Sequence, residues 1–207
     1  MIGMRGWEHP DWTPGFYPEE LPPEWRLTFY ANHFTTVLVP AERWLSGVGQ
    51  DLEQWLEDTG DGFRFVLELP SDHERRQDEI SLRMRILDQR IAALVVPYVR
   101  GSMAPTLARF GDWPISIRAP DGLSIEERTQ LRRAGASILW DPSRTPGPEA
   151  GGRMLVTVLH LPTDHDMVEV TQKLENVCAT FPGIAFFLSG PPHNGQKLRA
   201  AATLLGL

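Results

Sequence analysis

Side chains able to transfer a proton are few near the expected ends of the apolar runs in this sequence. His160 and Glu68 each stand near the carboxyl end of such a run, which makes them the candidates for general acid–base catalysis. His9 and Asp11 lie close together near the amino end of the chain, at a spacing that suits either a metal ion or hydrogen bonds within a turn. If these four side chains converge, their nitrogen and oxygen atoms suit zinc or manganese.

No pattern typical of a resident metal accompanies these residues. The sequence has no HExxH, paired CxxC or calcium-loop motif, so we expect no metal site and no cofactor, with a divalent cation as the alternative. His160 has a competing interpretation as a hydrogen-bonded core histidine. The one cysteine, Cys178, lies in an apolar helical pattern, which predicts a core thiol rather than a nucleophile.

A second group of candidates would bind an anion. The segment SGPPHNG at residues 189–195 joins an apolar run to a helical pattern. In parallel barrels, phosphate often binds after the last strands, where backbone N–H groups and a helix amino terminus face the anion. Ser189 and Asn194 would contribute from this segment, and Arg118, at the end of an earlier run, would add positive charge. The alternative is a simple turn followed by a helix that Asn194 caps.

The opening stretch GWEHPDWTPGFYP, residues 6–18, is too broken by proline and glycine for a helix or a central strand. It is also too aromatic for an ordinary solvated loop. Trp7 and Trp12 are candidates to stack on a ligand at one end of the molecule. The alternative is that the aromatic residues form only a hydrophobic lid, with the prolines limiting the entropy cost of ordering it.

Eight short apolar runs rich in β-branched residues predict the strands that must position these side chains. They cover residues 2–4, 35–39, 63–69, 93–96, 115–118, 137–140, 154–159 and 184–188. Most are continuously apolar, as expected of strands buried on both faces. Segments of helical period separate them, which favours parallel strands because parallel neighbours need a crossover connection. The sequence therefore predicts an α/β fold, a single TIM-barrel-like (βα)8 domain over residues 1–207.

The barrel should be a trimmed one. At 207 residues the chain is shorter than the typical barrel of about 250 residues. Residues 141–153 (DPSRTPGPEAGGR) are rich in proline and glycine, so we expect a loop in place of the sixth helix. Helices are predicted over residues 23–33 and 51–58, along an apolar stripe from Ile80 to Ile91, after a capping box at Ser124 and Glu127, along a stripe from Met167 to Phe181, and after an Asn194 cap.

Charge and hydropathy narrow the classes of partner. A formal charge of −7 argues against nonspecific nucleic-acid binding, which depends on cationic surface. No apolar run approaches the roughly 20 residues needed to cross a bilayer, and the amino end lacks the layout of a signal peptide. The sequence therefore predicts a cytoplasmic protein that binds neither nucleic acid nor membrane.

Both ends of the chain resemble a known family. GW, DWTPGFYPEEL and EWRLTFYANHFTTV near the amino end, Trp55 and GFRF at residues 62–65, and the final IAFFLSGPPHNGQKLRAAATLLGL are similar, in order, to segments of the YecE-like family (domain of unknown function seventy-two). The resemblance is strongest over the first seventy residues and the last twenty-five. It implies a TIM-barrel-like fold and a protein of unknown function.

Several polar positions of the family pattern differ here. Leu38 and Pro40 stand where the family has glutamate and asparagine, and Glu68 stands where it typically has lysine. Val158 replaces an arginine, whereas the neighbouring His160 is retained. We therefore expect a diverged, non-catalytic binding or interaction barrel with a reduced pocket, whose partner is a small anionic ligand or a protein. The alternative is a hydrolase-like enzyme acting on a phosphorylated or sugar-like molecule at the carboxyl-end face of the barrel.

Overall fold

A single sheet of parallel strands forms the centre of the protein. The computed structural model describes residues 1–46, 50–101, 103–140, 149, 151–160, 171–172, 175–176, 178–179 and 183–204. Its strands are β1 (Ile2–Arg5), β2 (Thr36–Val39), β3 (Arg64–Glu68), β4 (Ile91–Pro97), β5 (Ile115–Arg118), β6 (Ser137–Ile138), β7 (Leu155–His160) and β8 (Ile184–Ser189). They follow the order β6-β5-β4-β3-β2-β1-β8-β7, and every neighbouring pair is parallel.

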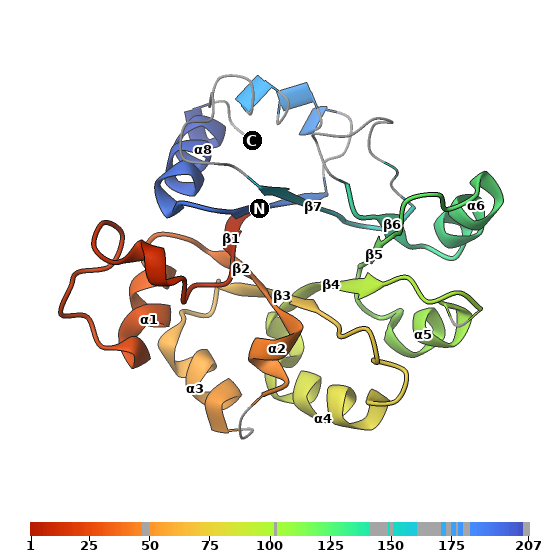
Figure 1. Ribbon diagram of the computed structural model, residues 1–207, viewed down its shortest axis with the longest axis horizontal. Helices are drawn as coiled ribbons and strands as arrows, with labels where there is room; N and C mark the ends of the chain where they lie inside the picture. Colours follow the sequence, from red (N-terminus) through yellow and green to blue (C-terminus); the bar gives the residue numbers. More distant parts are fainter. Residues whose placement is uncertain are drawn as a thin grey trace.

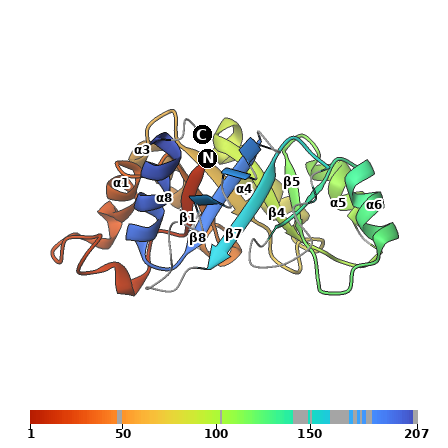
Figure 2. The same ribbon diagram turned by 90° about the horizontal axis from the view of Figure 1, so that it is seen from above.

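The two ends of this sheet approach each other. A parallel bridge between Trp140, just beyond β6, and Thr157 of β7 brings the outermost strands together. The sheet is therefore an eight-stranded, nearly closed barrel, which confirms the predicted α/β, TIM-barrel-like fold. Figure 2 shows the barrel from the side, with the opening segment and the start of the last helix on the same side as the arrowhead of β7.

Side chains from five strands, β2, β3, β4, β7 and β8, fill the inside of the barrel. A fully buried apolar cluster combines Leu38, Val66, Ala93, Val95, Val156, Ala185 and Phe187. Because successive strand residues point to opposite faces, Glu68 lies on the same face as Val66. Gly3 brings β1 close to β2, since a Cβ there would collide with the carbonyl oxygen of Thr36. The interior is thus a packed core, in which the buried hydroxyl of Ser116 accepts from the Val156 N–H at 3.0 Å, and the charged side chain of Glu68 lies at the end of its strand.

Helices surround the barrel, as Figure 1 shows. They are α1 (Arg26–Ala31), α2 (Ala41–Trp44), α3 (Gln50–Asp58), α4 (Gln77–Leu87), α5 (Met103–Phe110), α6 (Ile125–Arg133) and α8 (Pro192–Leu204), with 3₁₀ turns at Pro10–Trp12, Pro23–Trp25 and Asp88–Arg90. A larger buried cluster lies between the helices and the outer face of the strands. Within the described ranges, no helix is both long and apolar enough to span a membrane.

The helix predictions had mixed outcomes. The capping box of α6 is confirmed: the Ser124 side chain accepts from the Glu127 N–H, and the Glu127 carboxylate accepts from the Ser124 N–H. The Asn194 cap is wrong, because α8 begins earlier, at Pro192, whose fixed φ suits a first helical turn. Helices α2 and α5 were not predicted.

Other predictions fall where the structure gives little or no description. The five residues of the apolar stripe from Met167 to Phe181 lie outside the described residues, whereas the described positions between them, 171–172, 175–176 and 178–179, are helical. The loop expected over residues 141–153 is described only at Glu149 and residues 151–153, none of which is helical. Glu149 forms an antiparallel bridge with Ile138. The replacement of the sixth helix therefore stays a prediction.

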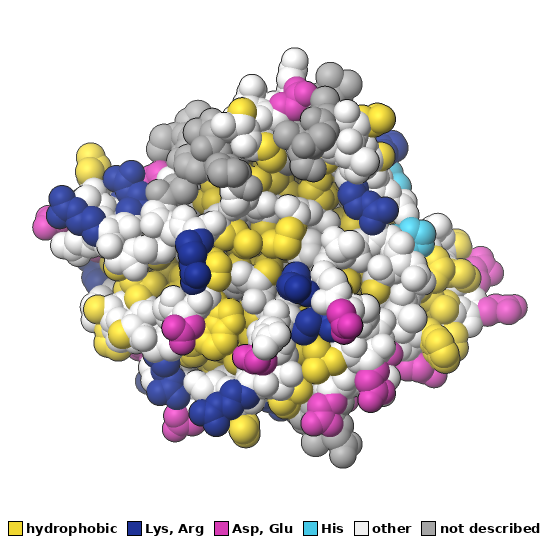
Figure 3. All heavy atoms as spheres, turned by 180° about the vertical axis from the view of Figure 1, so that it is seen from behind, with side chains coloured by type: hydrophobic (Ala, Val, Ile, Leu, Met, Phe, Trp, Pro, Cys, Tyr) yellow, Lys and Arg dark blue, Asp and Glu magenta, His cyan; other side chains and the backbone are white. Residues whose placement is uncertain are grey.

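Figure 3 shows the face opposite to that of Figure 1. Hydrophobic side chains are visible near its centre. Among the side chains drawn in colour, the basic ones are scattered between acidic ones rather than gathered into a single patch. Among the described side chains, this face therefore shows no extended cationic surface.

Candidate functional site

Three strand ends contribute one cluster of charged side chains, which we call the arginine cluster: Arg5, Glu68 and Arg118. They are the last residues of β1, β3 and β5, three alternate strands of the sheet. Arg5 donates from Nε to Oε1 of Glu68 at 2.8 Å and from Nη2 to Oε2 at 2.7 Å. Arg118 donates from Nη2 to Oε1 of the same carboxylate at 2.7 Å. Layers built from alternate strands are typical of barrel interiors, so this cluster lies across the carboxyl end of the barrel.

The carboxylate of the arginine cluster is buried, whereas the guanidinium groups are not. The Glu68 side chain is 3% exposed, the Arg5 side chain 30% and the Arg118 side chain 43%. Burial alone would raise the pKa of Glu68, but the hydrogen bond from Arg5 and the positive charge of Arg118 outweigh it and hold that pKa below its usual range. The three side chains in contact therefore carry a net charge of +1, with the positive groups on the solvent side.

The backbone of Glu68 is fixed by a hydrogen bond as well. The indole Nε1–H of Trp44, on α2, donates to the carbonyl oxygen of Glu68 at 2.8 Å. Trp44 itself is fully buried, and so is Val66, which lies two residues before Glu68 on the same face of β3. Such buried apolar side chains lower the local dielectric constant and strengthen the attraction between the carboxylate and the arginines.

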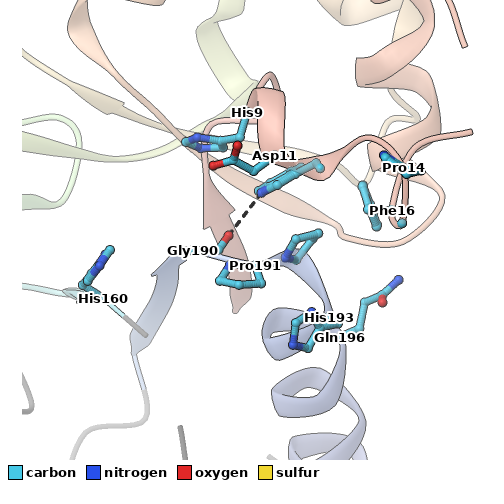
Figure 4. A pocket seen from close by; sticks show the side chains of 12 residues that line it. His9, Asp11, Pro14, Phe16, His160, Gly190, Pro191, His193 and Gln196 are labelled. Carbon is cyan, nitrogen blue, oxygen red and sulfur yellow. Dashed lines mark hydrogen bonds between the residues drawn. The ribbon is translucent and has the colours of Figure 1, made fainter. Parts of the chain in front are cut away.

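A second region, which we call the hollow, lies between the opening segment and the turn before α8. Its volume is about 690 Å³, within the range of small-molecule sites. The lining includes side chains that the sequence singled out, His9, Asp11, Trp12 and His160. Figure 4 shows His9 and Asp11 beside the Gly190–Pro191 turn, with His160 apart from them across the opening.

Two hydrogen bonds fix the opening segment in place. The Nε2 atom of His9 lies 2.7 Å from the backbone oxygen of Arg5. A carbonyl oxygen only accepts, so Nε2 carries the proton and the Nδ1 atom of neutral His9 has a free lone pair. The indole Nε1–H of Trp12 donates to the carbonyl oxygen of Gly190 at 3.1 Å and ties this segment to the end of β8 (Figure 4).

The remaining candidates lie in different environments. Trp7 is 2% exposed and packs edge-on against Trp55, with ring centroids 4.9 Å apart, so it belongs to the hydrophobic core and does not line the hollow. Ser189 is partly buried and pairs in register with His160 of β7. Asn194 is 3% exposed within α8, and its Nδ2 has no hydrogen-bond partner among the residues that the structure describes.

The structure thus divides the predicted residues between two regions. Glu68 and Arg118 join the arginine cluster, whereas His9, Asp11, Trp12 and His160 line the hollow. Within the described parts of the chain, no three His, Cys, Asp or Glu side chains are grouped as a metal site. The hypothesis that Glu68, His9, Asp11 and His160 converge on one cation is therefore not supported there, because two arginines occupy the Glu68 carboxylate.

Sequence reasoning missed Arg5, His193 and Gln196. Arg5 was missed because the first strand was predicted to end at Met4, one residue too early. A charged residue directly after a buried apolar run was the signal that could have identified it. His193 and Gln196 line the hollow from α8. The signal for His193 was its place in the SGPPHNG segment, which Gln196 directly follows.

The fold and the charged strand ends define a protein of the parallel α/β-barrel class with a polar carboxyl-end face. The sequence model of the family described as "Protein of unknown function DUF72" matches residues 1–188. The chain therefore belongs to the DUF72 family, which confirms the family predicted from the sequence.

Solved structures agree with this assignment. A DUF72 family protein from Thermotoga maritima is similar, with a TM-score of 0.75, 14% identity, and coverage of 100% of this chain and 99% of that one. A DUF72 family protein from Enterococcus faecalis has a TM-score of 0.67 and 12% identity, over 87% of this chain and 93% of that one. At such identities the likeness concerns the fold alone. No curated protein matches the chain.

Proposed function

We propose that this protein binds a small anionic molecule, bearing a phosphate or carboxylate group, at the carboxyl end of its barrel. The observation that carries the proposal is the arginine cluster, in which two guanidinium groups converge on one buried carboxylate. Arg5 and Arg118 would contact the anion, and Glu68 would hold them in position. The excess positive charge and the partial exposure of both arginines support this role.

Most hydrogen-bond donors of Arg118 have no acceptor among the described residues. A guanidinium group has five N–H donors, and the one protein acceptor of Arg118 among the described residues is Glu68. Arg5 uses two donors on the same carboxylate. Planar guanidinium groups match phosphate and carboxylate oxygens in bidentate geometry. Because Glu68 fixes both groups beforehand, less side-chain entropy is lost when an anion binds.

The geometry favours binding over the alternative of hydrolysis. Glu68 accepts three charged hydrogen bonds, and its lowered pKa suits a fixed negative charge rather than a proton donor. His160, the other candidate for acid–base catalysis, lies in the hollow and not in the arginine cluster. Turnover of a phosphate ester would be the result that favours the enzyme.

Calorimetric titration with inorganic phosphate, at fixed low ionic strength, tests the proposal. Arg118→Met should weaken phosphate binding about tenfold or more, because a charged hydrogen bond to a ligand is lost. Arg109→Met is the matched control, since Arg109 is similarly exposed but pairs with Asp78 on α4. Equal phosphate affinity in the wild-type protein and the Arg118 variant, or no binding by either, would contradict the proposal.

A further inference from the structure

The hollow differs in chemistry from the arginine cluster. None of its lining residues is a lysine or arginine, so among the described residues it offers no fixed positive charge to an anion. It does offer acceptors: the Asp11 carboxylate, which has no protein donor among the described residues, and the Nδ1 atom of His9. Gln196 adds its amide oxygen, because its Nε2 lies 3.4 Å from His33 Nδ1. A ligand that fills the hollow should therefore supply hydrogen-bond donors.

Hydroxyl groups fit these acceptors better than an ammonium group does. Three imidazoles, those of His9, His160 and His193, line the hollow, and a neutral imidazole combines one N–H donor with one acceptor, which matches hydroxyl groups that both donate and accept. Trp12 is only 3% exposed and its Nε1–H is already bonded to Gly190, so the ring face is not available as a cation–π surface. A neutral, polyhydroxylated group remains the chemical class that matches the hollow.

The hollow and the arginine cluster meet at the end of β1. His9, in the lining of the hollow, is bonded to the backbone oxygen of Arg5, and the guanidinium of that same residue binds Glu68. Arg5 therefore links the two regions, since its backbone contacts the lining of the hollow and its side chain belongs to the arginine cluster. A single small molecule with an anionic group and a hydroxylated body would reach both.

We infer that the hollow binds the hydroxylated body of the anionic ligand, and that the ligand class is a phosphorylated sugar or polyol. This inference rests on the proposed anion site and adds a second binding region to it. A site whose acceptors are built to receive hydroxyl groups discriminates strongly against an analogue that lacks them, because the acceptors are then left unpaired. The preference for hydroxyl groups is therefore the property to measure.

Three probes separate the two regions in one calorimetric series: ribose 5-phosphate, n-pentyl phosphate and inorganic phosphate. Ribose 5-phosphate should bind about tenfold more tightly than n-pentyl phosphate, as expected for one or two additional hydrogen bonds to charged or fixed acceptors. Asp11→Ala should remove most of this preference and leave the affinity for inorganic phosphate unchanged. Glu19→Ala is the matched control, because Glu19 is an exposed acid that directly follows the opening segment and does not line the hollow.

The outcomes distinguish this inference from the proposed function. If the wild-type protein binds phosphate but does not prefer ribose 5-phosphate, or if Asp11→Ala leaves the preference intact, the inference is overturned and the anion site stands. If inorganic phosphate does not bind at all, the anion site fails. Ribitol, which has no anionic group, then tests the hollow alone. It should shift the NMR signal of the Trp12 indole N–H, which the variant Trp12→Phe identifies. An unshifted signal overturns the inference.

Discussion

Arg90 and Arg118 stand at opposite ends of the barrel strands and use their hydrogen-bond donors differently. Arg90 directly precedes β4, and its side chain is 14% exposed. It donates to the carbonyl oxygen of Phe63 at 2.9 Å, to that of Gly60 at 2.6 Å and to the hydroxyl oxygen of Thr59 at 2.7 Å. Arg118, at the carboxyl end of β5, donates to one carboxylate oxygen of Glu68.

The difference shows how one residue type serves either stability or binding. At the amino end, Arg90 satisfies the backbone of the turn that leads into β3, and few donors remain for a ligand. At the carboxyl end, Glu68 orients Arg5 and Arg118, which are partly exposed and keep several N–H donors that pair with no acceptor among the described residues. This agrees with the general division of labour in parallel barrels, in which the carboxyl end carries the site and the opposite end supports the fold.

Glu68→Gln should have the largest effect on stability of the variants considered. It removes the charge that compensates two arginines, and we expect a loss of about 2–3 kcal/mol, near the lower end for a buried pair because both arginines are partly exposed. Urea unfolding measures the change. Glu79→Gln is the control, since Glu79 forms a more exposed pair with Arg76 and should cost less than about 1 kcal/mol.

The loss of stability in Glu68→Gln should also depend on pH. The pKa of Glu68 is held below its ordinary value of 4.5 in the folded protein. Such a group stabilises the fold above its unfolded-state pKa and loses that contribution as the pH falls through the lower folded-state pKa. The stability difference between wild type and Glu68→Gln should therefore be constant near neutral pH and shrink below pH 4.5. A difference that grows on acidification would contradict the ionised carboxylate at the centre of the arginine cluster.

Arg90→Met should destabilise the protein by about 2 kcal/mol, because several backbone and side-chain acceptors lose their donor. The loss should appear in thermal or urea unfolding, whereas the affinity for phosphate should not change. Arg118→Met should show the reverse, with weaker phosphate binding and less than about 1 kcal/mol of destabilisation. The contrast between the two ends breaks down if both arginine variants lose stability equally.

The sequence could predict the strands but not how they bring residues together. Continuous apolar runs predicted each of the strands β1 to β8, because burial on both faces of a strand leaves a strong compositional signal. The hollow was predicted in part, because His9, Asp11, Trp12 and His160 stood out in an aromatic loop and at a strand end. The arginine cluster was not, because it depends on side chains of β1, β3 and β5 that reach past the strands between them.

The structure also explains two specific errors of prediction. Ending the first strand at Met4 excluded Arg5, although strand β1 continues through that residue. Reading Asn194 as a helix cap followed a sound preference, but the proline at the start of α8 begins the helix earlier and places Asn194 inside it. In both cases the boundary of an element, rather than its existence, decided whether a polar side chain faced a site.

Ser124→Ala gives the smallest expected effect and tests what orients Arg118. Ser124 caps α6, whose amino end follows the loop after Arg118, and its loss should cost about 1 kcal/mol. If Glu68 fixes the guanidinium, as the 2.7 Å hydrogen bond indicates, phosphate affinity should be unchanged despite the weaker helix. Calorimetry on this variant and on Glu127→Gln, which alters the other half of the capping box, measures this directly. A parallel loss of affinity and stability in both would show that the loop, and not the carboxylate, holds Arg118 in place.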